Sequence, residues 1–143
     1  MKLLLLTLGV SVVFAAWQWL RPYEWNADPG ARYGVTRTLV ERDHSNLWLR
    51  VFLKQTGADK HDFLKPVALI TAAGREHEPA DTAMSGNVTR EMEEVTFSFW
   101  LTEDDFKGPL KLKLNDGTLL IRTGDTLPRL GDGAFRVFNS TRW

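Results

Sequence analysis

Apolar and polar residues alternate with a period of two over most of the chain after residue 33, and this is the pattern of half-buried β-strands. The clearest run is NLWLRVFLK at 46–54, whose four aliphatic residues fall on one face. A second run, VTFSFWL at 95–101, alternates in the same way. Further strands are expected at 35–41, 65–72, 110–114, 118–122 and 134–139. About seven short strands favour an all-β antiparallel sandwich of two sheets, and a small open barrel is the alternative.

The segments between these strands carry turn signals. Asn115-Asp116-Gly117 predicts a hairpin turn between the strands at 110–114 and 118–122. Lysines alternate with leucines in the first of these strands, which suits a half-exposed or edge position. Residues 75–92 are polar and include Pro79 and Gly86, so they indicate a long connection that could hold one short strand.

The beginning of the chain follows a different pattern. LLLLTLGVSVVFAAWQWL, from Leu3 to Leu20, carries no charge and is long enough to cross a hydrocarbon core of ~30 Å as a helix. We expect residues 1–20 to be a transmembrane anchor, with the rest of the chain extracytoplasmic, in the periplasm or at the cell surface. The alternative is a signal peptide cut near Ala16, which would release a secreted domain.

Aromatic residues gather just after this apolar run, where amphipathic rings favour the membrane interface. The expected interface residues are Trp17, Trp19, Arg21, Tyr23 and Trp25. Residues 21–34 contain a Pro-Gly turn signal and read as a linker, which leaves residues 35–143 as the folded domain.

Charge and cysteine content exclude several classes of function. The 18 basic and 18 acidic residues give a formal net charge of zero, without the basic surface that nucleic acid requires, so we expect no nucleic-acid partner. The chain has no cysteine, which excludes disulfides, cysteine-based metal sites and a lipoprotein anchor.

Catalytic signatures are weak. His44 and His77 could share one end of a sandwich and form a two-histidine metal site with Asp43 or Glu78, which would suit a metal-dependent hydrolase. The simpler interpretation is that the histidines are solvated loop residues, and that the acidic run 103–105 is a solvated turn. We therefore expect no enzymatic activity, no metal and no cofactor.

The aromatic residues of two strands give a sharper prediction. If the aliphatic faces of 46–54 and 95–101 point into the core, Trp48, Phe52 and Trp100 point outwards, with Arg50 beside them. Tryptophan and arginine are favoured anchors of protein interfaces, so these four residues form the expected binding patch. Alternatively, aromatic residues near either end of the chain fold back and cover it, or both faces belong to the core.

Four stretches carry a resemblance: YGVTRTLVERDHSNLWLRVFLK, VALITAAGREHEPAD, EEVTFSFWL and LKLKLNDGTLLIRTG. Their order resembles the small immunoglobulin-like domains that follow signal peptides or anchors in bacterial extracytoplasmic proteins of unknown function. The resemblance implies an immunoglobulin-like sandwich and brings no catalytic residues with it. Many members of that group carry an anchoring cysteine, which this chain replaces by an apolar helix.

These features together predict a non-catalytic binding or assembly module, an accessory subunit tethered to a membrane complex through residues 3–20 and contacting a protein partner. The alternative is a secreted domain that binds a small ligand or carbohydrate through the same aromatic residues.

Overall fold

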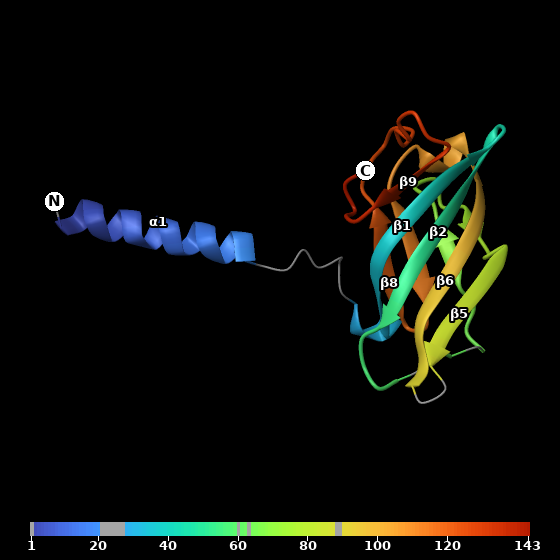
Figure 1. Cartoon of the computed structure of the whole chain (residues 1–143), viewed down its shortest axis with the longest axis horizontal. Coiled ribbons are helices and arrows are strands. Elements are labelled where there is room, and N and C mark those ends of the chain that lie inside the picture. Colours follow the sequence, from blue (N-terminus) through green and yellow to red (C-terminus); the bar gives the residue numbers. More distant parts are fainter. Residues whose placement is uncertain (1, 21–27, 60, 63, 88–89) are drawn as a thin grey trace.

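The computed structural model describes residues 2–20, 28–59, 61–62, 64–87 and 90–143 (Figure 1). The described part contains one α-helix, two short 3-10 helices and nine strands. Their bounds are α1 (Lys2–Leu20), η1 (Pro29–Ala31), β1 (Tyr33–Asp43), β2 (Asn46–Gln55), β3 (Ala68–Ile70), β4 (Glu76–His77), β5 (Asp81–Asn87), β6 (Arg90–Thr102), η2 (Glu103–Phe106), β7 (Leu110–Leu114), β8 (Gly117–Arg122) and β9 (Phe135–Phe138).

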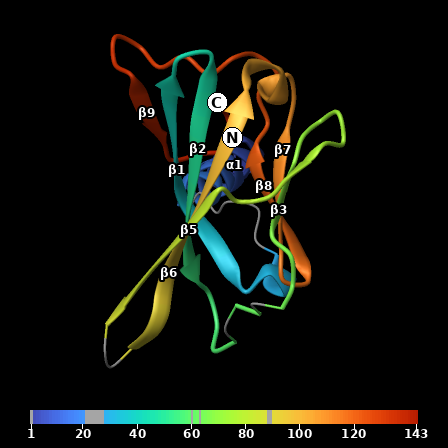
Figure 2. The ribbon, with the colours of Figure 1, turned by 90° about the vertical axis from the view of Figure 1, so that its right-hand side faces the viewer.

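The strands form two antiparallel sheets, which confirms the predicted all-β sandwich. One sheet has five strands in the order β5-β6-β2-β1-β9, and the other has four in the order β4-β3-β7-β8. Figure 2 shows the two sheets facing each other, with successive hairpins placed alternately in one and then the other. The chain therefore crosses between the sheets after each hairpin.

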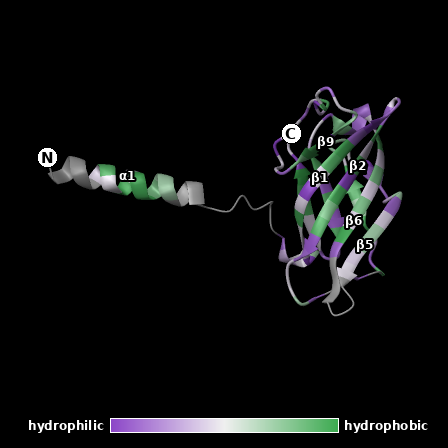
Figure 3. Cartoon of the chain, viewed as in Figure 1, coloured by the Kyte–Doolittle hydropathy of each residue, from purple (hydrophilic) through white to green (hydrophobic). Residues whose placement is uncertain are grey.

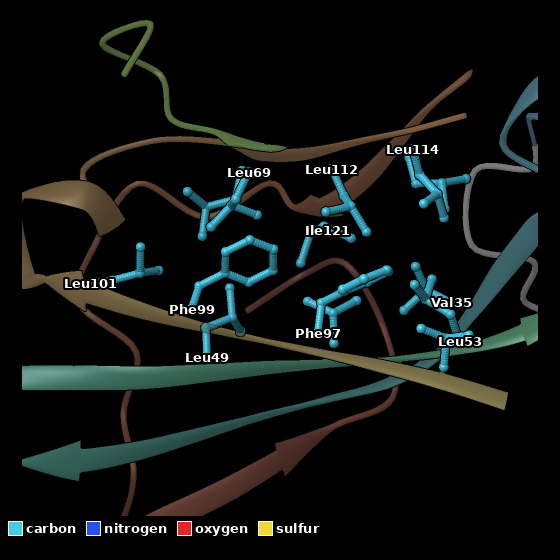
Figure 4. Packing of buried hydrophobic residues seen from close by; sticks show 14 of the residues in the cluster. Val35, Leu49, Leu53, Leu69, Phe97, Phe99, Leu101, Leu112, Leu114 and Ile121 are labelled. Atoms are coloured by element: carbon cyan, nitrogen blue, oxygen red, sulfur yellow. The ribbon is translucent and has the colours of Figure 1, made fainter. Parts of the chain in front are cut away.

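The core lies between the sheets and is made of the aliphatic and aromatic residues that the alternation places inwards (Figure 4). In β2 the four inward residues, Leu47, Leu49, Val51 and Leu53, are at most 1% exposed, while their neighbours are partly exposed. Burying an aliphatic side chain of this size stabilises the fold by roughly 1.5–3 kcal/mol. The period of two thus decides which face of each long strand is buried.

The sequence-based prediction was wrong about residues 75–92. The described residues of this stretch form β4, β5 and the start of β6, where a long connection that could hold one short strand was expected. Strand β5 is an edge strand, and its residues 81–86 are all exposed, so it carries no inward apolar alternation that the sequence could reveal. Strand β7 lies between β3 and β8, so its lysines mark a half-exposed strand that is not at an edge.

The start of the domain is fixed to the β7–β8 turn. Helix η1 lies within the predicted linker, and its Gly30 and Ala31 carbonyls accept hydrogen bonds from the Asp116 amide, at 3.0 Å, and from Asn115 Nδ2, at 2.7 Å. Asp28 caps η1 through the amide of Gly30 and also accepts from the amide of Thr118. These bonds set the place where the N-terminal segment leaves the sandwich.

Gly117 is required at this junction, because a Cβ built on it would lie 2.3 Å from the backbone nitrogen of Ala31. We expect Gly117→Ala to lower the free energy of unfolding by about 2 kcal/mol, as overpacking against backbone does. Gly57→Ala is the matched control, since its Cβ would meet nothing within 4 Å, and it should change stability by less than about 0.5 kcal/mol. Urea unfolding of both variants tests this; equal effects would show that η1 is not fixed to the turn.

Residues 2–20 form helix α1, and Figure 3 shows hydrophobic residues along its described middle. Its side chains at Leu8, Val10, Val12, Val13 and Phe14 are 57–69% exposed. A search of the described residues finds no helix long and apolar enough to cross a membrane. Trp17 and Trp19 belong to α1 with side chains that are not described, and Arg21, Tyr23 and Trp25 lie outside the described residues.

Candidate interaction surface

The four predicted patch residues lie together on the outer face of the five-stranded sheet. Strands β2 and β6 are neighbours, and their register places Trp48 directly opposite Trp100. Arg50 and Phe52 follow Trp48 on the same face of β2. We call this set, Trp48, Arg50, Phe52 and Trp100, the aromatic face.

The two tryptophans form an edge-to-face pair at the centre of this surface. Their ring centroids are 4.6 Å apart, with 76° between the ring planes. Trp100 remains 40% exposed, although Phe99 and Leu101 on either side of it are fully buried. An edge-to-face pair contributes about 0.5–1.5 kcal/mol beyond burial, so the rings hold each other in place while one side stays open to solvent.

Charged side chains border the aromatic rings. The Arg37 guanidinium carbon lies 4.3 Å from the centre of the Phe52 ring, a cation–π contact. Arg50 Nη1 lies 3.1 Å from Glu41 Oε2, and both side chains are more than a third exposed. Such an exposed ion pair contributes little to stability and can exchange one partner for another.

Strand β9 extends the same face with apolar side chains that the sequence did not assign to the patch. Phe135 lies opposite Glu41 and Val137 opposite Leu39, and these two β9 side chains are 58% and 42% exposed. The alternation of AFRVFN placed Phe135 and Val137 on one face, but only the pairing of β9 with β1 brings that face beside Trp48.

The rings near the C-terminus do not cover the aromatic face. Phe138 and Trp143 stack on each other, with centroids 4.4 Å apart and 10° between planes, and both pack against the core. Tyr23 and Trp25, the other rings that could cover it, lie outside the described residues.

The histidines are not assembled as the metal-site alternative requires. His44 is 95% exposed and contacts Asp43 at 2.7 Å, whereas His77 donates from Nε2 to Asp105 at 3.0 Å. Among the described residues no group of three histidine, cysteine or carboxylate side chains could hold a metal ion.

His61 also differs from the prediction of a solvated loop histidine. It is only 9% exposed, and its Nδ1 lies 2.9 Å from Asn115 Oδ1. Its ring meets those of Tyr33 and Phe97 edge to face. The residue therefore connects the loop after β2 to the β7–β8 turn beside η1.

Asp105 is the most enclosed carboxylate in the described structure, which corrects the prediction of a solvated acidic turn. It is 1% exposed and accepts from the Thr102 amide at 2.8 Å and hydroxyl at 2.9 Å. Arg75 Nη2 lies 2.8 Å from its other oxygen, which also binds His77. Burial alone would raise the pKa of Asp105, but the hydrogen bonds from Thr102 and His77 together hold that pKa below its ordinary value.

The groups that donate to Asp105 belong to Thr102, His77 and Arg75, and His77 takes part through one of its two ring nitrogens. The cluster joins the β3–β4 hairpin of the four-stranded sheet to η2, which directly follows β6 of the five-stranded sheet, and is therefore a structural connection between the two sheets.

Comparison of the chain with family models, with curated proteins and with solved structures finds no match.

Proposed function

We propose that this protein is a non-catalytic binding module that docks a partner protein on the aromatic face. The single observation that carries the proposal is the Trp48–Trp100 pair, in which Trp48 is half-buried and Trp100 is exposed, bordered by Phe52 and by Arg50 on the outer face of the five-stranded sheet. Tryptophan and arginine dominate binding energy at protein interfaces, and exposed apolar patches mark contact surfaces on soluble domains.

The position of the aromatic face supports a docking role. Helix η1 immediately precedes Tyr33, at the start of β1, whereas Trp48 lies opposite Glu41, near the end of β1. Along a strand, the eight residue-to-residue steps from Tyr33 to Glu41 span about 26 Å. The rings are therefore far from the point where the N-terminal segment leaves the domain, so a tethered domain could still present them to a partner.

The strand order supports an immunoglobulin-like assignment for the fold. The order β5-β6-β2-β1 in one sheet and β4-β3-β7-β8 in the other corresponds to the D-E-B-A and C′-C-F-G arrangement of such domains. Strand β9 is an addition beside the first strand. The chain has no cysteine for the bond between the sheets, which are joined by core packing and by the polar contacts described above.

The N-terminal segment completes the proposal. We propose that residues 1–20 deliver the domain to the extracytoplasmic side of a membrane and keep it there as an accessory subunit of a membrane complex. The uncharged run from Leu3 to Leu20 and the exposed apolar side chains of α1 support this role, because such side chains favour an apolar environment over water.

A secreted carbohydrate-binding domain is less well supported. A sugar stacks its flat face on aromatic rings that lie parallel to the surface, and the Trp48 and Trp100 rings cross at 76°. Crossed rings present the edge of one ring and the face of the other, which suits an aliphatic or aromatic side chain of a protein partner.

The test is to purify the tagged full chain from gently solubilised membranes and to compare it with Trp48→Ala/Trp100→Ala. We expect a stoichiometric partner with the original chain and at least about 30-fold weaker binding with the double variant, since each hot-spot residue contributes 2 kcal/mol or more. Leu64→Ala/Met84→Ala is the matched control, because both side chains are exposed and apolar but lie elsewhere. Retention of the partner by the tryptophan variant, with its fold intact by circular dichroism, would contradict the proposal.

The same preparation reports the fate of the N-terminus. Peptides from residues 3–20 in the membrane fraction would support a retained anchor. A chain that begins near Ala16 and is found only in the soluble fraction would contradict the tethered subunit and favour a secreted domain.

A further inference from the structure

The C-terminal segment closes one side of the sandwich and carries three arginines. Strand β9 pairs with β1 in one sheet, and the Thr123 amide then donates to the Thr141 carbonyl beyond β8, at 2.8 Å. Residues 123–143 therefore pass from the edge of one sheet to the edge of the other. We call this stretch the closing segment.

A hollow of about 420 Å³ lies within the closing segment, between residues 127–129 and 136–143. Three of its lining residues are arginines, Arg129, Arg136 and Arg142, and all three are exposed. No aspartate or glutamate is among the described residues that line it. We call it the arginine hollow.

These three arginines differ from the cations of the described structure that are held in ion pairs. Arg32, Arg42, Arg50, Lys65, Arg75 and Lys107 each lie within ion-pair distance of a carboxylate. Arg129, Arg136 and Arg142 have no such partner within 4.0 Å among the described residues; Arg136 Nη1 donates to the Arg129 carbonyl at 3.0 Å. That bond directs one guanidinium across the hollow towards the segment that carries the second.

The chemistry of the hollow is that of a receptor for an anion with an apolar part. Guanidinium groups stay charged and match the oxygens of a phosphate group with paired N–H donors. Leu127 and Val137, also in the lining, are 38% and 42% exposed. The indole N–H of Trp143, a further lining residue, is buried without an acceptor in the described structure. Like charges gathered in this way repel unless an anion neutralises them.

We propose that the arginine hollow binds a phosphate group whose attached organic part packs on Leu127 and Val137. A phosphate is favoured over a carboxylate because its second charge neutralises more of the three guanidiniums. The group could come from a soluble phosphate monoester, which carries this second charge, or from an anionic phospholipid headgroup, whose phosphodiester presents one charge and two free oxygens to the guanidinium donors. This site shares none of the four residues of the aromatic face, although its Val137 lies on the same side of the sheet. It does not depend on the function proposed for the aromatic face.

The experiment uses the isotope-labelled full chain in an uncharged detergent micelle and follows its amide NMR signals. Inorganic phosphate is titrated first, at constant ionic strength kept with chloride. The original chain is compared with Arg129→Gln/Arg142→Gln. The matched control is Lys111→Gln/Lys113→Gln, which removes the same charge from exposed positions of β7. A second arm places the chain in phosphatidylcholine nanodiscs with and without phosphatidylglycerol.

We expect saturable shifts confined to residues 127–143, about tenfold weaker binding in the arginine variant, and unchanged binding in the lysine variant. Shifts with phosphate indicate a soluble ester as a sufficient ligand, and shifts only with phosphatidylglycerol indicate the headgroup; either supports the site. Absence of shifts in both arms, or shifts weakened equally by the lysine variant, would overturn it.

Discussion

Replacing Arg122 with methionine is expected to lower the free energy of unfolding by about 3 kcal/mol or more. Arg122 is 1% exposed, and its guanidinium donates to the carbonyls of Phe106, Thr126 and Trp143, the last from Nε at 2.6 Å. These three carbonyls belong to separate stretches of chain. The residue therefore attaches the closing segment to the end of β8 and to η2.

Two opposing effects decide the size of this loss. Burial lowers the pKa of Arg122, although Asp125 opposes that shift, so a neutral side chain would relieve an unfavourable buried charge. Methionine, however, leaves three carbonyl oxygens without their donor, at about 1–3 kcal/mol each. It also loses the guanidinium that lies 5.5 Å and 5.2 Å from the Phe106 and Trp143 rings. The loss of these hydrogen bonds and ring contacts is larger than the gain from removing the buried charge.

Arg136→Met is the control, because that arginine also lies over a ring, Phe138 at 5.3 Å, but is exposed. Its loss should change stability by less than about 1 kcal/mol. Urea unfolding measures the stability of both variants. Trypsin digestion shows whether the closing segment is the part that is released, since its release opens it to cleavage after Arg129. Similar stability and similar cleavage in the two variants would show that Arg122 does not hold the segment.

The position of Arg122 also shows where the alternation of residues stops predicting the fold. In TLLIR the period of two places Arg122 outwards with Leu120, and β2 follows that rule along its length. The structure shifts register between Leu110 and Lys111 of β7, so Ile121 and Arg122 are both buried. A one-residue bulge turns every later side chain to the other face, and no residue type in this stretch announces it.

The candidate surface was predictable to the extent that it depends on alternation within one strand. Trp48 and Phe52 were assigned outwards from the aliphatic residues between them. The pairing of β2 with β6 brings Trp100 beside Trp48. From the sequence this pairing had to be assumed, because strand order is set by contacts between residues far apart in the chain. The position of Phe135 relative to this surface could not be predicted, since Phe135 reaches the surface through the pairing of β9 with β1, and β9 is far from β2 and β6 in the chain.

Asp105 was missed for a different reason, although a signal for it exists in the sequence. Thr102 and Asp105 have the spacing of a capping box, in which the side chain of the third residue of a helix bonds back to the residue before the helix. The run Glu103-Asp104-Asp105 looks uniformly acidic, and charge runs are usually solvated. Only the capping geometry separates the buried member from its two exposed neighbours.

Asp105→Asn is expected to lower the free energy of unfolding at neutral pH by about 2–4 kcal/mol. The carboxylate is surrounded by donors only, from Thr102, His77 and Arg75, and an amide places an N–H₂ group against some of them. Asp104→Asn is the matched control. Asp104 is the adjacent residue, its side chain is 67% exposed, and its ion pair with Lys107 is of the surface type that contributes little.

The effect of Asp105→Asn on the free energy of unfolding should change with pH in a known direction, which a simple loss of packing would not produce. The folded pKa of Asp105 is below its ordinary value, so the unfolded chain binds the proton more readily. Its contribution is therefore fully present above the unfolded pKa of about 3.9 and is lost as pH falls through the folded pKa. Urea unfolding at neutral pH and at successive values below pH 4 should show the difference between Asp105→Asn and the original chain shrinking with acid. A difference that stays constant with pH, or one no larger than that of Asp104→Asn, would mean that the buried carboxylate is not what holds η2 to the β3–β4 hairpin.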